Sequence, residues 1–228
     1  MIQPLVDGLW TVPGEASMGF VHFPCRMTIL RLTDGRLMLI SPVALTDEDV
    51  AGIAELGEVA YLVAPNGFHH LFLGAAQARF PNAATYAVPV VQKKKQKHLR
   101  YDGVLTKLDS PPWHPDVEQL RIAGIPALDE VVFFHKATKT VIVTDLFFNL
   151  TEVANLATKM MFQMVGAWGK PAQSALEKFL TKDRAAAKAS IETMLAWAPE
   201  RIIMAHGNIL DGPDAVEQAR SGMAWTLR

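Results

Sequence analysis

YLVAPNGFHHLFLG, residues 61–74, is the stretch from which the fold and the site are both predicted. Its first four residues have the β-branched and aromatic content of a buried strand, and Pro65, Asn66 and Gly67 then end that strand. His69 and His70 follow, at the place past a strand end where α/β proteins bind ligands. Because imidazole is the commonest protein ligand for transition metals, the pair indicates a metal site. The alternative is a helix cap and a core side chain.

Size and composition exclude several classes of protein. The chain has 228 residues, 50% of them hydrophobic and 20% charged, as in a soluble globular protein with one large domain or two small ones. A net charge of −1 gives no basic field for nucleic acid. Cys25 is the single cysteine, which excludes an intramolecular disulfide and a Cys-rich zinc site. With neither a signal-peptide pattern nor a run of ~20 apolar residues, we expect a cytoplasmic protein without a membrane span.

Hydrophobic periodicity predicts a mixed α/β chain in two similar halves. A strand, a loop through Pro24 and a hairpin come first, followed by a helix from Thr46, the strand at residues 61–64 and another helix. A surface helix is expected at residues 89–97. The second half has a hairpin at residues 130–144, helices from residue 151 to 198, a strand at 201–205 and a last helix. This order fits a layered sandwich.

Two surface features have alternative interpretations. The basic run at residues 93–100, KKKQKHLR, is either a solvated helix face or a patch that steers an anionic substrate or surface. The Met-rich segment at residues 160–164 is either core, a cover over a site mouth, or a subunit contact in a homo-oligomer.

Two further predicted strands end in side chains suited to metal binding. Asp145 directly follows the apolar run at residues 141–144, and His206-Gly207 ends the run at residues 201–205. Asp145 alone could be a turn or cap residue, and His206 alone could be a polar stop. Three strand ends that carry imidazoles and a carboxylate together indicate a common metal centre.

The pattern resembles the metallo-β-lactamase superfamily, which implies an αββα sandwich in a single domain over residues 1–228. Most similar is an uncharacterised, mainly bacterial branch of it. The resemblance is carried by Arg-Met-Thr at 26–28, Ser-Pro at 41–42, Ala-Pro-Asn-x-x-His-His at 64–70, Glu-Val-Val-Phe-Phe-His at 130–135, Thr-Asp-Leu-x-Phe-Asn at 144–149 and Ala-His-Gly at 205–207.

The metal motif of that superfamily is only partly kept. Its order is His-x-His-x-Asp-His, His, Asp, His. Laid on residues 65–70, its first two histidines fall on Pro65 and Gly67, its Asp on His69 and its closing His on His70, and no His is present near residues 126–128. The losses remove one metal site. For the other, the resemblance implies His69, His70, Asp145 and His206 as ligands.

The function implied is a mononuclear metal-dependent hydrolase acting on a small ester, lactone or phosphoester through metal-activated water. Zn is the expected metal, with Fe, Mn or Ni as alternatives. Glu130 could orient a ligand and Asn66 could bond a substrate oxygen, or each could be an ordinary strand or turn residue. The competing interpretations are a non-catalytic metal- or ligand-binding protein and a non-haem iron redox protein.

Overall fold

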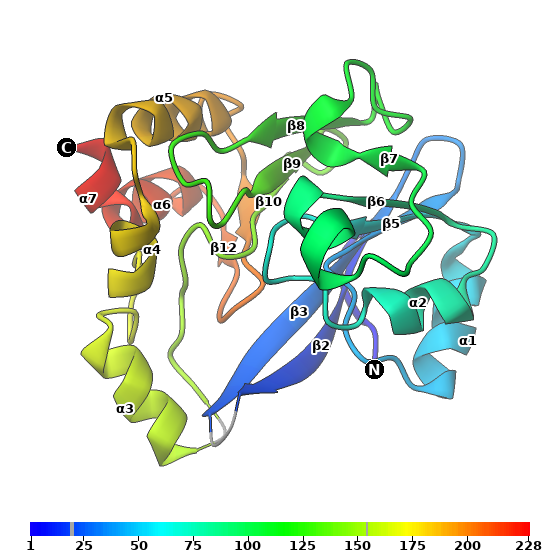
Figure 1. Cartoon of the computed structure of the whole chain (residues 1–228), viewed down its shortest axis with the longest axis horizontal. Coiled ribbons are helices and arrows are strands. Elements are labelled where there is room, and N and C mark those ends of the chain that lie inside the picture. The colour runs from blue at the N-terminus through cyan, green and yellow to red at the C-terminus, as the bar shows by residue number, and fades with distance from the viewer. Residues whose placement is uncertain (19–20, 154) are drawn as a thin grey trace.

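The computed structural model describes residues 1–18, 21–153 and 155–228, and it contains two β-sheets with helices packed against them (Figure 1). The first sheet has the order β1 (Gln3–Val6), β2 (Leu9–Met18), β3 (Val21–Arg31), β4 (Leu37–Ile40), β5 (Val59–Ala64), β6 (Ala84–Ala87) and β7 (Gly103–Val104). The second has the order β12 (Leu210–Asp211), β11 (Arg201–Ile203), β10 (Thr140–Ile142), β9 (Val131–His135) and β8 (Val117–Arg121).

Different helices cover the two sheets. Ile53 of α1 (Asp47–Leu56) and Leu73 of α2 (Leu73–Arg79) belong to the core of the first sheet. Ile191 of α5 (Arg184–Leu195) and Ala219 of α6 (Ala215–Gly222) belong to the core of the second. The chain also forms α3 (Leu156–Met164), α4 (Ala175–Leu180), α7 (Ala224–Leu227), a π-helix η1 (Val91–Lys95) and a 3-10 helix η2 (Leu105–Lys107). The predicted α/β sandwich is confirmed.

Parallel pairing brings the site-bearing strand ends to common edges. In the first sheet β4 and β5 run parallel, and in the second β10 and β11 do. The two sheets are joined just past β5, where the Val131 N–H donates to the Pro65 carbonyl and the Gly67 N–H donates to the Leu128 carbonyl. The turn that follows β5 is therefore fixed against the start of β9.

Trp113 packs between the two sheets. Its side chain is 1% exposed, and its ring makes edge contacts with Tyr61 and Tyr86 of the first sheet at centroid distances of 5.5 and 5.0 Å. A third edge contact, at 6.2 Å, is with Phe133 of the second sheet. One indole thus ties both layers through aromatic contacts, which add to the apolar area that it buries.

Three local predictions differ from the structure. The loop expected before Pro24 is mostly strand, because β2 and β3 pair along their length despite its Gly and Pro content; residues 19 and 20 lie outside the described part. The surface helix expected at 89–97 is the short π-helix η1. The helix expected from 151 begins at Leu156, after the N-cap Asn155, and residue 154 is not described.

None of the helices in the described ranges has the length and apolar character that crossing a bilayer requires.

Replacing Trp113 by Ala should lower the free energy of unfolding by about 3–5 kcal/mol, because the cavity would lie between two sheets that cannot both relax into it. Urea unfolding with a common slope measures the change. Trp225→Ala is the control, since that ring is 37% exposed, and it should cost much less. Equal losses in the two variants would contradict the packing role given to Trp113.

Candidate metal centre

Three side chains converge at the strand ends. His69 Nε2 lies 3.2 Å from Asp145 Oδ1 and 3.2 Å from His206 Nε2, and His206 Nε2 lies 3.1 Å from Asp145 Oδ1. Asp145 and His206 each follow their strand by three positions, after the paired residues Ile142 and Ile203. That equal offset on parallel strands brings the carboxylate and the imidazole together.

The fourth expected ligand, His70, is not part of this group. The grouped ligand atoms, all within 4.8 Å of one another, belong to His69, Asp145 and His206. The His70 ring is directed elsewhere, with its Nδ1 3.4 Å from Gln96 Nε2. Burial, and then the charge of Lys95, lowers the pKa of His70. Adjacent residues in a turn direct their side chains differently, and here only the His69 imidazole of the pair points into the group.

Each imidazole of the group is oriented through its other nitrogen. His206 Nδ1 donates to the Pro24 carbonyl at 2.7 Å. Because a carbonyl only accepts, this bond fixes the tautomer and directs the Nε2 lone pair of a neutral ring into the group. His69 Nδ1 lies 2.6 Å from Ser41 Oγ, so His69 also presents Nε2. Both rings are prepared to bind an ion through Nε2.

Charge within the group is strongly coupled. Burial alone would raise the pKa of Asp145, but the imidazoles of His69 and His206 hold it well below its ordinary value. Burial alone would lower the pKa of His69, but the Asp145 carboxylate reverses the direction and the net shift is upward. The carboxylate and the His69 imidazole therefore favour each other's charged forms. A divalent cation would likewise favour the charged form of the carboxylate.

A buried carboxylate supports the Asp145 segment from below. Glu130 is 0% exposed and accepts from the backbone N–H groups of Thr144 at 2.7 Å and Asp145 at 2.8 Å. Burial, and then the charge of Asp145, raises the pKa of Glu130, against the pull of those N–H groups. Glu130 thus positions the backbone that carries Asp145. Its donors are the Thr144 and Asp145 N–H groups and the Asn66 amide, rather than an imidazole, which the sequence analysis considered as its partner.

Asn66 joins the two sides of the group. Its Nδ2 lies within 2.8–3.1 Å of Asp145 Oδ2, Thr144 Oγ1 and Glu130 Oε2. Its Oδ1 accepts from the backbone N–H groups of Phe68 and His69, which is the Asx-turn geometry. With 0% exposure and both donors engaged by protein acceptors, Asn66 serves the turn and the Asp145 carboxylate rather than a substrate.

Two positioning residues were missed by the sequence analysis. Arg26 donates through one nitrogen to the carbonyls of Met204 and Gly207, at 2.8 and 2.7 Å, and so holds the loop on both sides of His206. Ser41, which orients His69, has a φ of +58° that few non-glycine residues adopt. A signal for Ser41 existed, because it follows the apolar run at residues 37–40, as the other site residues follow their strands.

The group opens onto a cavity of about 550 Å³. Its lining is mainly apolar and comes from residues 16 and 17 of β2, residues 23 and 25 of β3, the 68–72 turn, the segment after Asp145, and α3 and α4. Among its polar members is Glu177, the N3 residue of the α4 capping box, whose Oε2 accepts from the Ser174 N–H at 2.6 Å. A cavity of this volume fits a small organic molecule.

The three ligand atoms suit a small divalent cation. An ion with four tetrahedral bonds of about 2.0 Å separates its ligand atoms by about 3.3 Å, close to the 3.1–3.2 Å spacing found here. Two imidazole nitrogens and a carboxylate oxygen are donors that zinc and other first-row metals accept. An ion held by these three side chains alone would have a coordination position left for water or a substrate, as in catalytic sites.

The fold is the metallo-β-lactamase fold. DIM-1 metallo-β-lactamase exposed to ceftazidime matches with a TM-score of 0.66 at 14% identity, over 99% of this chain and 96% of that one. A metallo-β-lactamase from Erythrobacter litoralis with β-mercaptoethanol in its active site gives 0.65 at 16% identity, over 98% and 96%. FIM-1 from Pseudomonas aeruginosa in its mono-zinc form gives 0.63 at 15% identity, over 100% and 96%.

Within this fold, the chain belongs to the family described as Domain of unknown function (DUF4336), whose model matches residues 6–164. The matched region contains His69 and Asp145, while His206 lies beyond it. No curated protein sequence matches the chain significantly.

Glu177→Gln should stabilise the protein at alkaline pH. Burial raises the pKa of Glu177 from 4.5 to about 7. Between these values the folded chain binds more protons than the unfolded chain, so the stability of the unmutated protein falls as pH rises. Glutamine keeps the acceptor for Ser174 and has no proton to lose. The variant should therefore be more stable by about 1–3 kcal/mol at pH 8 and similar at pH 4.

Thermal unfolding across pH 4–8 measures this difference. Glu217→Gln is the control because Glu217 is exposed on α6, and its difference from the unmutated protein should not change with pH in the same way. A stability difference for Glu177→Gln that stays constant from pH 4 to pH 8 would show that Glu177 is not charged at a cost in the folded protein.

Proposed function

We propose that this protein is a mononuclear metal-dependent hydrolase that cleaves a small ester, lactone or phosphoester with water. The observation that carries the proposal is the convergence of His69 Nε2, Asp145 Oδ1 and His206 Nε2 at 3.1–3.2 Å beside the cavity. A divalent ion held there would polarise the bond to be cleaved and lower the pKa of water toward ~7. Zn fits these donors, and so do Fe, Mn and Ni.

The chain's own residues would hold and orient this centre. Ser41 and the Pro24 carbonyl orient the two imidazoles, and Glu130 with Asn66 fixes the carboxylate. The apolar lining of the cavity would exclude bulk water around the substrate and so strengthen electrostatic interactions there. The mono-zinc form of FIM-1 supports a one-ion centre on this fold. The oligomeric state and the cytoplasmic location stay predictions.

A redox function at non-haem iron is the second candidate. Two histidines and one carboxylate that leave positions open form the donor set of many Fe(II) oxygenases. A set of three converging side chains supports this alternative as much as it supports zinc. Iron retained through purification of untagged protein, with visible absorption, would support redox chemistry over hydrolysis.

The neighbouring histidines give a sharp test of the three-ligand centre. His69→Gln, Asp145→Asn and His206→Gln should each weaken zinc binding by more than about 100-fold, because even residues that only orient ligands contribute about 10–100-fold. His70→Gln should leave the affinity nearly unchanged, since its ring faces Gln96. Competition with a chromogenic chelator measures the affinity, and His98→Gln is a surface control. A large loss in His70→Gln would restore the four-ligand set.

Activity is tested with a panel of generic ester, lactone and phosphodiester substrates. Protein loaded with each metal should show turnover that a chelator abolishes and that Asp145→Asn lowers by at least about 1,000-fold, as the loss of several kcal/mol of transition-state stabilisation requires. Tight metal binding without chelator-sensitive turnover on any substrate would favour the non-catalytic binding protein.

A further inference from the structure

The cavity has an apolar side and a cationic side. On the apolar side, α3 and α4 contribute a continuous wall made of Met161, Phe162, Val165, Leu176 and Leu180. Phe148, which follows Asp145 by three residues, extends this wall to the metal centre and packs against Phe162 at a centroid distance of 6.1 Å. The wall therefore offers an apolar surface that begins at the candidate metal centre and leads away from it.

Two polar groups of the cavity lining, Ser41 after β4 and Glu177 in α4, have partners within the protein. Ser41 lies against His69, and the Ser174 N–H donates to Glu177. A substrate that extends along α3 and α4 would thus gain mainly from burial of apolar surface, at about 25 cal/mol per Å². Sugars and other strongly polar groups would lose hydration on this side without finding matched partners.

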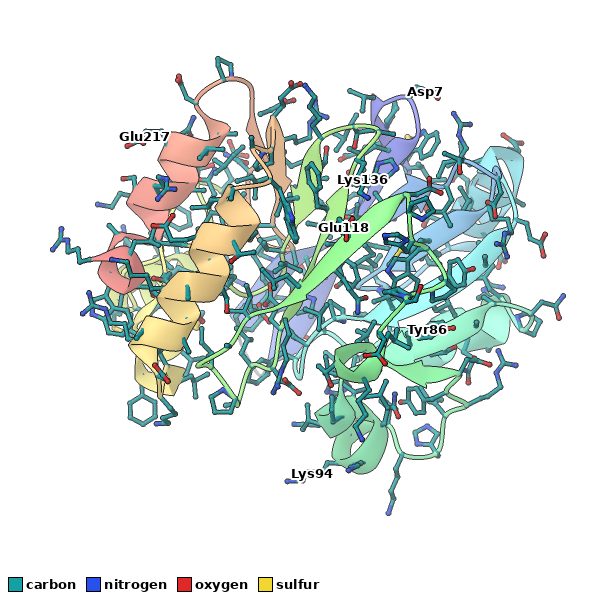
Figure 2. The ribbon with its side chains drawn as sticks, turned by 90° about the horizontal axis from the view of Figure 1, so that it is seen from above. Asp7, Tyr86, Lys94, Glu118, Lys136 and Glu217 are labelled. Carbon is teal, nitrogen blue, oxygen red and sulfur yellow. The ribbon has the colours of Figure 1, made fainter. Side chains whose placement is uncertain are left out.

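The opposite side carries positive charge. Lys95, in η1, lines the cavity, and Lys93 and Lys94 precede it in the same π-helix. The segment from residue 89 to residue 100 contains no acidic residue. In Figure 1, α3 and α4 lie on the left and the green helical segment after β6 lies to their right. Figure 2 shows Lys94 at the outer edge of the molecule, directed into solvent.

We propose that the ligand of this cavity is an amphipathic anion, whose apolar chain lies along α3 and α4 while its phosphate or carboxylate group faces Lys95. The bond to be cleaved would then lie between the two parts, at His69, Asp145 and His206. This inference rests on the proposed hydrolase function, because it names the class of substrate for the same site. Of the basic run, Lys95 is thereby assigned to substrate binding, while Lys94 faces solvent.

Binding of simple amphiphiles tests this assignment without turnover. Calorimetry on the full chain, metal-free and zinc-loaded, would compare octyl phosphate, octanoate, 1-octanol and inorganic phosphate, all as monomers. Octyl phosphate and octanoate should bind, and 1-octanol should bind about tenfold more weakly, as expected for an exposed cluster of cations. Inorganic phosphate should not bind measurably. The preference over 1-octanol should shrink at high salt, because exposed charges are screened.

Matched variants separate the two sides of the cavity. Lys95→Gln should weaken octyl phosphate about threefold and leave 1-octanol unchanged, while Lys107→Gln, exposed on η2, should change neither. Met161→Gln should weaken every octyl ligand about fivefold, which is roughly the transfer free energy of one buried methylene group. Its neighbour Met160, 54% exposed, is the control.

The outcomes that overturn the proposal are distinct. Equal binding of octyl phosphate and 1-octanol, insensitive to Lys95→Gln, would show that the cavity does not recognise an anionic group through Lys95. Equal binding of octyl phosphate and inorganic phosphate would show an adventitious anion site only. Binding to phosphatidylglycerol vesicles without binding of any monomeric octyl ligand would indicate a lipid surface instead. Amphiphile binding without hydrolysis of any ester would overturn the proposed function while leaving this assignment intact.

Discussion

The site depends on a buried carboxylate that accepts hydrogen bonds from the backbone. Glu130 is out of contact with solvent and would be costly to bury as an ion unless its oxygens were fully paired. The N–H groups of Thr144 and Asp145 and the amide of Asn66 supply that pairing. Because these partners come from both sheets, satisfying one charge also sets the position of the Asp145 ligand atom and of the turn that carries His69.

Much of the site could be predicted from the sequence, because strand ends are visible in it. Apolar runs that stop at His69, Asp145 and His206 are local patterns, and parallel pairing makes their ends meet. The separation of the His70 ring from this group was beyond such reasoning, since the direction of a side chain within a turn depends on the backbone there. The roles of Ser41 and Arg26 depend on partners 28 and about 180 residues away, and although Ser41 follows an apolar run, that pattern does not identify its partner.

The fold shows the same division between local and distant information. The sandwich follows from the order of strands and helices, and it is confirmed. The β2–β3 hairpin was missed as regular structure because Gly14 and Pro24 weaken a strand signal, whereas in the molecule both residues are paired with the opposite strand. That pairing matters for chemistry, because it brings the Pro24 carbonyl to His206 and the Arg26 guanidinium to the loop around it.

The candidate metal-binding group spans two layers of the sandwich, with His69 supplied by the first sheet and Asp145 and His206 by the second. Any ion that binds all three therefore acts as a cross-link whose binding free energy is thermodynamically linked to the docking of the layers. Changes far from the cavity that loosen the interface around Trp113 would reappear as weaker metal affinity, and occupancy of the centre would in turn report on the integrity of the whole sandwich.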